Sequence, residues 1–486
     1  MIVSNAKSND SVSMQILSPQ QRRSIIQSAK QVLENTGCKV LHAGAREMLA
    51  QAGARVDGEH VRIPRFLVED SLRAAPEGII IYDRKGNPAL DLTGRNTYYG
   101  TSTASPKTRD AVTREVHPTR VEDIARGAKI ADALTNIDWV MPFGSSQDVP
   151  AITADIYEFE AVVNNTTKPL AFCGYSPRGV ELVFEMAAQV AGGREALKDR
   201  PFILAYPEPI SPLVYPDDVV DKMFLAADWG IPQITTGAGQ ADATAPATLA
   251  GTLVQMVAEA MASATMIQLR QKGAPMFFAG NFGNFDMRTG LNSMASPEGS
   301  LMQGTMAEIA REFKLPSWGY AGTTDSKCLD AQAGMESAFS ILAQGMAGIN
   351  LIHDVGYMDM AMVCSAEMLV LGNEAVGMAK RFIGGVQVTP ETLACDVLHR
   401  VGPGGNFLQE RHTMDHFKSA WYPELFTRES NATWENNGKK DMAQKCHEKV
   451  QTILETHTPE PLDPQIQARL TEMRMAGEKE LTDMVA

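Results

Sequence analysis

The sequence predicts an α/β fold: a (β/α)8 TIM barrel with an N-terminal α+β cap and a C-terminal helical extension. From residue 96 onward, short apolar runs that end in Gly, Ser, Thr, Asn or Asp alternate with longer helical patterns. Strands that alternate with helices imply parallel strands joined by right-handed crossovers. The chain has eight such runs, the number that closes a barrel, and its 486 residues suffice for one large barrel with additions.

The cap is expected over 1–95, where the hydrophobic period changes from helical to strand-like and back. Ser18 as an N-cap, followed by Pro19, predicts a helix that Gly37 ends. The other predicted cap elements are a helix over 44–52, a strand over 60–64, a helix over 64–74 and a strand over 78–83.

The barrel is expected over 96–370. Its predicted strands are 97–101, 138–143, 169–174, 201–207, 232–237, 275–280, 316–322 and 348–354, separated by helices over 120–134, 156–165, 176–191, 217–228, 247–270, 297–313 and 330–347. A doubly wound open sheet is the competing fold, but no GxGxxG follows the first strand. The extension, 371–486, contains predicted helices over 414–421 and 441–457.

Composition and charge narrow the classes of protein. Lys and Arg number 44 against 58 Asp and Glu, which gives a formal net charge of −14 without any basic run, so we expect no nucleic-acid partner. The six cysteines are scattered without a CxxC pair, and no signal peptide is recognised, which predicts a reducing cytoplasm. No apolar run reaches the roughly 18 residues of a membrane span.

Active sites of such barrels lie at the C-terminal ends of the strands. This rule selects a set rich in aromatic residues: Tyr98, Tyr99, Phe143, Gly174, Tyr175, Tyr206, Gly237, Asn281, Phe282, Phe285, Tyr320, Thr323, Asp325, Lys327, His353 and Tyr357. Each aromatic residue taken alone is more simply explained as core. Together they are typical of a cage for a quaternary ammonium group, although an apolar pocket for a small molecule predicts the same set.

Motifs for other chemistry are weaker. Cys328 and His353 belong to successive strand–helix units, but a nucleophile pair needs contact between them, so structural roles are favoured. His412 and His416 lie one helical turn apart without further ligands, which favours a solvated helix face over zinc; no metal site is predicted. Arg288, in the loop after the sixth strand, is equally well explained as a carboxylate clamp or as a surface ion pair.

Four stretches carry a resemblance to a known family. They are HVRIPRFLVEDSLRAAPEGIIIYDR (60–84), YYGTSTA (98–104), GTTDSKCLDAQAG (322–334) and GINLIHDVGYMD (348–359). In these stretches the chain resembles the trimethylamine methyltransferase family of corrinoid-dependent methyltransferases. The resemblance implies a TIM barrel that moves a methyl group from an N-methylated amine to the cobalt of a cognate corrinoid protein.

The chain departs from the family at one position. Trimethylamine enzymes of the family carry pyrrolysine inside the barrel, and the matching position falls within 322–327, where this chain has only standard residues. Pyrrolysine is thought to activate a tertiary amine. Its absence implies a substrate that is already charged, a quaternary amine such as glycine betaine, proline betaine or carnitine, whose leaving group is a neutral tertiary amine.

The resemblance also implies roles for the strand-end residues. A polar cavity is expected from Thr323, Asp325 and Lys327, and the corrinoid (cobalamin) of the partner protein is expected to approach Gly237, Gly239 and Gly322. Substrate contacts are expected from Tyr98, Phe143, Asn281, Phe282, Arg288, Tyr320, His353 and Tyr357. We also expect a homo-oligomer.

Two other classes of function stay open. Lys327 is the residue that an unrelated barrel lyase would use to form a Schiff base with a carbonyl substrate. A non-catalytic binder of methylated amines would need only the aromatic cage.

Overall fold

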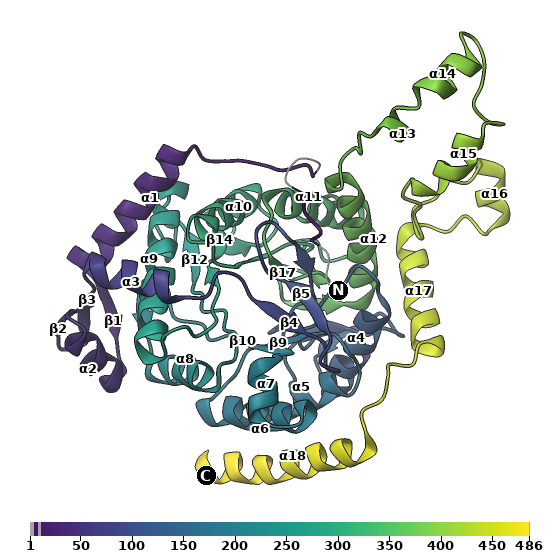
Figure 1. Cartoon of the computed structure of the whole chain (residues 1–486). Helices are drawn as coiled ribbons and strands as arrows, with labels where there is room; N and C mark the ends of the chain where they lie inside the picture. Colours follow the sequence, from purple (N-terminus) through teal and green to yellow (C-terminus); the bar gives the residue numbers. More distant parts are fainter. Residues whose placement is uncertain (1–3, 8–10, 486) are drawn as a thin grey trace.

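The core of the protein is a ring of parallel segments surrounded by helices. The computed structural model describes residues 4–7 and 11–485 (Figure 1). One parallel ladder joins β9 (Leu170–Phe172) to β10 (Ile203–Ala205), and a second has the order β13 (Phe278–Ala279), β16 (Ser317–Tyr320), β17 (Leu351–His353) and β6 (Tyr98–Tyr99). Isolated parallel bridges connect the remaining neighbours: Gly100 to Trp139, Val140 to Leu170, Ala205 to Gln233 and Gln233 to Met276. The α/β class is therefore confirmed, but the regular ladders do not close into one continuous sheet.

Two of the eight predicted strands are reduced to these bridges. The runs over 138–143 and 232–237 pair with their neighbours through single residues and form no regular strand. Sequence periodicity located both segments but overestimated their hydrogen bonding.

The helices around the ring include the seven predicted ones, each within a few residues of its predicted range, and two for which no range was predicted, Arg194–Asp199 and Ala366–Ile383. They are α4 (Val121–Ala133), α5 (Ala154–Val163), α6 (Pro177–Ala191), α7 (Arg194–Asp199), α8 (Asp217–Trp229), α9 (Leu249–Arg270), α10 (Pro297–Glu312), α11 (Ala331–Ala347) and α12 (Ala366–Ile383). Within the described residues, α9 alone is long and apolar enough to cross a membrane, but 83% of its apolar window is buried inside the protein. Its composition is therefore explained by packing against the ring and the cap.

The N-terminal elements pack on the ring at two places. The helices α1 (Pro19–Gln31), α2 (Ala43–Gln51) and α3 (Arg65–Ala74) lie beside α9, and β1 (Cys38–Val40) pairs with β3 (His60–Arg62), which pairs with β2 (Arg55–Asp57). β1 also pairs in parallel with β11 (Val214–Tyr215), so hydrogen bonds cross the predicted boundary at residue 95. The division into three domains stays a prediction.

The hairpin β4 (Ile80–Tyr82) and β5 (Pro88–Asp91) closes one end of the ring. Ile81 and Leu90 belong to the same buried cluster as Trp139, Trp318 and Leu351. Figure 1 shows this hairpin across the centre of the ring. Because it precedes the first strand of the ring and contacts its start, it covers the N-terminal end of the strands.

Short strands lie at the opposite end of the ring. β12 (Ala238–Ala241), β14 (Asn281–Asp286) and β15 (Leu291–Ser293) form one sheet, and β18 (Tyr357–Met358), β19 (Val363–Ser365), β7 (Lys107–Arg109) and β8 (Val116–Pro118) form another. Each begins after a segment of the ring has ended. They build walls around the C-terminal ends of the parallel segments.

The last 100 residues are largely helical, as predicted: the helix predicted over 441–457 is confirmed within one residue at each end, whereas the one predicted over 414–421 is not. The helices are α13 (Pro390–Leu393), α14 (Cys395–Val401), α15 (Arg411–His416), α16 (Asn431–Asn436), α17 (Met442–Thr456) and α18 (Pro464–Val485). The predicted helix over 414–421 is instead α15 and a short 3-10 turn, Phe417–Ser419, because few of its side chains find packing partners. α17 packs on α12 and α4, and α18 packs on α5 and α6.

Candidate functional site

Aromatic and acidic side chains meet at the C-terminal ends of the parallel segments. They come from the chain directly after β10, from the start of β14, from β16 and β17 and from β18. We call this group the His353 cluster and define it as Tyr206, Glu208, Asn281, Trp318, Tyr320, His353, Asp354 and Tyr357.

His353 lies at the centre of the cluster. Its imidazole stacks on Trp318 with ring centroids 4.3 Å apart, and Tyr206 and Tyr320 present T-shaped contacts at 6.3 and 6.1 Å. Nδ1 of His353 donates to Oδ1 of Asp354 at 2.6 Å in the tautomer that this pairing favours, which fixes the ring. Its Nε2 is buried and has no hydrogen-bond partner. The imidazole of His353 is thus held in place by its neighbours and presents an unpaired nitrogen, Nε2, to a ligand.

Glu208 is the carboxylate of the cluster. Its side chain is accessible, yet surrounding protein atoms desolvate it enough to raise the pKa of the carboxyl above its usual range. A hydrogen bond from Tyr206 and the nearby His353 and Lys222 oppose that rise, while Asp354 adds to it. The Glu208 side chain therefore keeps accessible surface although protein atoms lie close around its carboxyl. An ion pair between Glu208 and a bound cation would be only partly screened by water.

Asn281 and the tyrosines complete the cluster. Nδ2 of Asn281 donates to the hydroxyl of Tyr206, and its Oδ1 is buried without a partner. The hydroxyl of Tyr320 donates to the carbonyl of Phe282 at 2.5 Å. Burial raises the pKa of Tyr320 and Tyr357 well above the usual range, with Asp354 as a further cause, so both rings stay neutral. Neutral rings keep the negative faces that attract cations.

Two thiols lie beside the cluster. Cys364 is buried and pairs with Tyr357 between β19 and β18, and Cys173 is partly buried and packs on the interior of the ring. Burial raises the pKa of the Cys173 thiol well above the usual range, and Glu208 adds to that effect. A thiol that stays protonated is a poor nucleophile. Cys328, the thiol weighed in the sequence, is exposed and lies 3.4 Å from Oδ2 of Asp330, so no contact with His353 supports a nucleophile pair.

The loop after β16 mixes buried and exposed positions. Thr323 is fully buried and its hydroxyl has no partner, whereas both carboxylate oxygens of Asp325 bind the β15 segment, at Ser293 Oγ and Met294 N. Lys327 is 63% exposed and pairs with Asp359 at 3.3 Å. These three residues were predicted to line a polar cavity. In the structure Thr323 has an unpaired hydroxyl, Asp325 binds the β15 segment and Lys327 lies at the surface.

Four predicted substrate residues lie outside the cluster. Tyr98 contacts the opposite end of the ring, where its hydroxyl accepts from the backbone N–H of Asp91. Phe143 packs toward Gly127 of α4, and Phe282 belongs to the core that surrounds α9 and α10. Arg288 is exposed at the turn between β14 and β15. Strand-end position in sequence did not reveal which way each side chain points.

The glycines predicted to admit a corrinoid have close protein neighbours. A Cβ on Gly237 would lie 2.5 Å from Oε2 of Glu259, and one on Gly239 would lie 2.5 Å from Sδ of Met256. Gly322 has φ +79°, a backbone conformation that favours glycine. Packing against α9 and turn geometry thus account for these glycines without a ligand.

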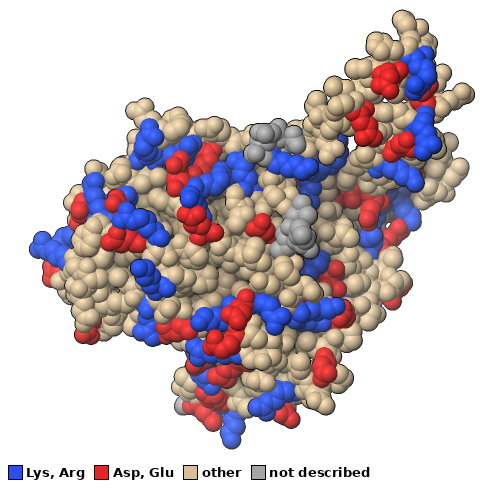
Figure 2. Space-filling view, viewed as in Figure 1, with Lys and Arg blue, Asp and Glu red and all other residues tan. Residues whose placement is uncertain are grey.

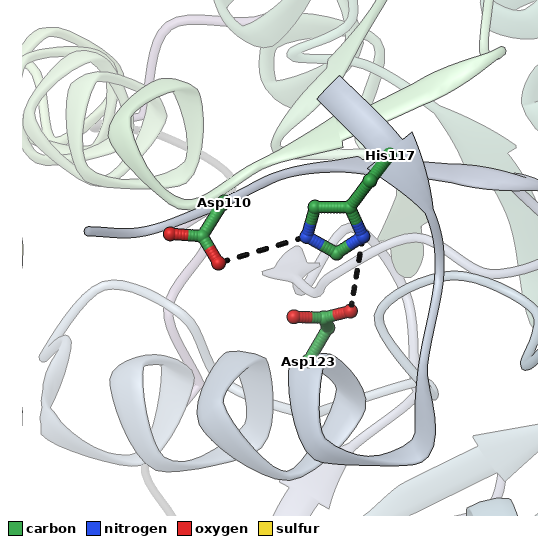
Figure 3. A group of neighbouring side chains, drawn as sticks. All are labelled: Asp110, His117 and Asp123. Carbon is green, nitrogen blue, oxygen red and sulfur yellow. Dashed lines mark ion pairs between the residues drawn. The ribbon is translucent and has the colours of Figure 1, made fainter. Parts of the chain in front are cut away.

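One group in the described residues has the composition of a metal site. Figure 3 shows His117 between Asp110 and Asp123, with Nε2 3.6 Å from Asp110 and Nδ1 3.8 Å from Asp123. The two ring nitrogens face opposite carboxylates, so the histidine contacts one carboxylate through each nitrogen. Backbone N–H groups of Val112, Thr113 and Arg120 already occupy carboxylate oxygens. The arrangement ties β7, β8 and α4 together.

Sequence reasoning missed Glu208, Asp354 and Trp318 as site residues. Glu208 follows the fourth predicted strand by one residue and Asp354 ends the eighth, so the strand-end rule could have selected both. Trp318 lies inside its strand and gave no such signal. Its place beside His353 depends on parallel β16 and β17, in which Trp318 pairs with Leu351 and Tyr320 with His353.

Comparisons with known proteins concern the family and the fold of the chain. The family model described as trimethylamine methyltransferase (MTTB) matches residues 3–480. A trimethylamine methyltransferase MttB from Desulfitobacterium hafniense is 34% identical over 91% of this chain and 90% of its own length, and a glycine betaine methyltransferase from the same species is 29% identical over 94% and 95%.

Among solved structures, the monomethylamine methyltransferase MtmB of Methanosarcina barkeri superposes with a TM-score of 0.52 at 12% identity, covering 97% of this chain and 88% of that one. At this identity the likeness concerns the fold alone, and it agrees with the ring of parallel segments described above. Because the family model spans nearly the whole chain, this protein belongs to the trimethylamine methyltransferase (MTTB) family and is a methyltransferase of that family.

Proposed function

We propose that the protein transfers a methyl group from a quaternary amine to the corrinoid of a cognate corrinoid protein. The observation that carries the proposal is the His353 cluster, in which neutral aromatic rings lie together with a carboxylate, Glu208, that accepts from Tyr206 and keeps accessible surface. A methylated ammonium group offers no N–H to donate, so aromatic faces and a nearby anion are the groups that bind it.

The residues of the cluster would act by positioning the substrate. Tyr206, Tyr320 and Tyr357 would contact the N-methyl groups, and Glu208 would balance the positive charge of the nitrogen. The corrinoid of the partner, when bound, supplies the nucleophile that accepts the methyl group. Holding the reacting N–CH3 bond in line with that nucleophile, in a site from which water is excluded, supplies the rate enhancement.

The reaction needs no proton from this chain. When the C–N bond of a quaternary amine breaks, the bonding pair stays on nitrogen and a neutral tertiary amine leaves. The free Nε2 of His353, which carries no proton in the tautomer that donates from Nδ1, is therefore proposed to orient the substrate, for example by accepting a hydrogen bond from a hydroxyl at its far end.

The placement of Arg288 bears on substrate choice. Because Arg288 is exposed at the turn after β14, we no longer propose it as the clamp for a betaine carboxylate. The cluster contributes two carboxylates, Glu208 and Asp354, and no arginine. This charge balance favours quaternary amines without a carboxylate over betaines, because a second anion beside Glu208 would be repelled.

The rim of the site suits a protein partner. Around it, Tyr175, Ile210 and Leu291 expose 42, 57 and 49% of their surface. Such apolar side chains at the mouth of a site favour contact with another protein, here the domain that carries the corrinoid.

The alternatives have less support. A Schiff-base lysine must be desolvated to become a nucleophile, whereas Lys327 is 63% exposed and pairs with Asp359. A non-catalytic binder would use the same cage, so only an activity measurement separates it from an enzyme.

The test is methyl transfer by the purified full-length protein to reduced cobalamin, and then to a cognate corrinoid protein, with single substrates. We would offer tetramethylammonium, choline, glycine betaine, proline betaine, carnitine and trimethylamine. Methylation from a quaternary amine with trimethylamine inert supports the proposal. Binding of a quaternary amine without transfer to either acceptor would identify a binder and overturn it.

A further inference from the structure

Residues 386–422, which we call the arm, extend from the body of the protein without a core of their own. Figure 1 shows the segment with α13, α14 and α15 reaching outward beyond α12. The three helices bury a single side chain between them, Val397. The arm nevertheless displays large apolar side chains: Val386, Val388, Leu393, Leu398, Phe407, Leu408, Met414, Phe417 and Tyr422.

Such a segment is expected to need a partner surface. Leu408 is 81% exposed and Val386 77%, and a chain of fewer than about 40 residues rarely folds without help from disulfides, metals or association. Apolar side chains gathered on one protruding element mark an interaction site.

The arm could contact either the corrinoid protein or a second copy of this chain, and its position on the body bears on this choice. It leaves the body after Ile383, whose carbonyl accepts from Val12 N, beside Met346, whose carbonyl accepts from Met14 N and from Arg95. Arg95 lies three residues before the start of β6, so the arm begins at the N-terminal end of the parallel segments. It returns at Trp421, which lies against Gly377 in the last two turns of α12. The His353 cluster lies at the other end, so a corrinoid protein docked there does not cover the root of the arm.

The charge of the arm fits a second copy of this chain. The arm has four acidic residues against three Lys and Arg, whereas the whole chain has a net charge of −14. Figure 2 shows both signs of charge interspersed on it with uncharged surface. A nearly neutral apolar element can approach another acidic body without the repulsion that two acidic surfaces would meet. Beside its root, Phe382 and Met378 of α12 expose apolar surface that a symmetry-related arm can cover.

We propose that the arm is a homo-oligomerisation element, which packs its apolar side chains on the arm and α12 of a second copy. In a two-fold arrangement the same surface serves both copies, and interfaces of permanent homodimers are large and apolar. This proposal is independent of the substrate and of the corrinoid partner.

The test compares the mass of the full-length protein in solution with that of two variants. We would measure sedimentation equilibrium for the wild type, for Leu408→Asp and, as a matched control, for Met475→Asp on α18, which is 61% exposed and outside the arm. Because Leu408 makes few contacts within its own chain, L408D is expected to fold. Circular dichroism of each variant checks this.

The expected result is an oligomeric wild type, an L408D variant whose dissociation constant rises at least about tenfold, and an unchanged M475D variant. A second arm variant, Val388→Asp, repeats the measurement if L408D fails to fold. A monomeric wild type at micromolar concentration, or arm variants as tightly associated as the control, would overturn the proposal. So would an arm variant that keeps its mass but loses methyl transfer to the corrinoid protein, since that result would assign the arm to the other partner.

Discussion

The two ends of the ring interior are both lined with aromatic residues, yet they differ in how their polar atoms are used. At the hairpin end, Tyr98 accepts a hydrogen bond from Asp91, and Ile81 and Leu90 fill the space around it. At the strand-end side, Nε2 of His353, Oδ1 of Asn281 and Oγ1 of Thr323 are buried without partners in the described structure. Unpaired buried atoms occur at the hairpin end as well, at Nε1 of Trp139, so they do not distinguish the two ends by themselves. The strand-end side adds an accessible carboxylate, Glu208, beside its unpaired atoms, and this combination suits a cationic ligand.

The largest effect is expected for Glu208→Gln. The substitution removes the negative charge beside the bound ammonium but keeps the side-chain shape, so kcat/KM should fall about 100-fold, in the range of a lost desolvated ion pair. Methyl transfer from the best quaternary amine measures it. The control at the opposite end is Tyr98→Phe, which should stay within about twofold of wild type. Equal losses in both variants would mean that the two ends do not differ in function.

A smaller effect is expected for Tyr320→Ala. Loss of one cation–π contact at a desolvated site should raise the dissociation constant of the quaternary amine about tenfold. Phe282→Ala is the comparison, because Phe282 packs in the core around α9 and α10 and its loss should lower the melting temperature more than the affinity. Calorimetric titration and thermal melts separate the two outcomes. An affinity loss in F282A that matches the loss in Y320A would return Phe282 to the cage.

The pH dependence of stability should report on Glu158, a buried carboxyl behind the strand-end site. Burial raises its pKa from the ordinary 4.5 to about 8, although hydrogen bonds from Ser146 lower it. The folded protein therefore binds the Glu158 proton more tightly than the unfolded chain does. The stability that this proton contributes is fully present below pH 4.5, declines as the pH rises and is lost as the pH passes about 8.

The variant Glu158→Gln, which keeps an acceptor for Ser146, should therefore flatten the fall in melting temperature between pH 5 and 8, two values that bracket most of the transition. Glu455→Gln, at an exposed position on α17, should leave the fall unchanged. A slope in E158Q equal to that of the wild type would assign the pH dependence to other groups, of which Asp155, with a pKa raised by burial to about 7, is the nearest.

The smallest effect is expected for Lys327→Ala. Because Lys327 is exposed and forms an ion pair at the surface, methyl transfer should change by less than about twofold. Loss of all activity, or trapping of a carbonyl adduct at Lys327 by borohydride, would instead favour the lyase.

Sequence reasoning was most accurate where local signals are strong. Ser18 and Pro19 predicted the start of a helix, and α1 begins at Pro19 with Ser18 accepting from Gln21 N. Asp330, where the helix over 330–347 was predicted to start, accepts from Ala333 N as the N-cap of α11. Caps depend on a few neighbouring residues, so they can be read from the sequence alone.

The direction of a side chain was harder to predict. Phe143 ends a predicted strand, Phe282 follows one and Tyr320 lies within one, but only Tyr320 joins the His353 cluster. In a parallel sheet, successive side chains alternate between the interior and the helices, so a shift of one residue moves a side chain to the other face. The predicted strand ends were not accurate to one residue.

The sequence by itself determined the α/β class, the order of strands and helices, the family and the end of the ring where the site should lie, because periodicity, caps and motifs are local or accumulate along the chain. The tertiary structure alone decided that Glu208, Trp318 and His353 meet, that Arg288 and Lys327 face solvent, and that the arm has no core. These outcomes depend on register and packing between segments distant in sequence, which a local pattern does not encode.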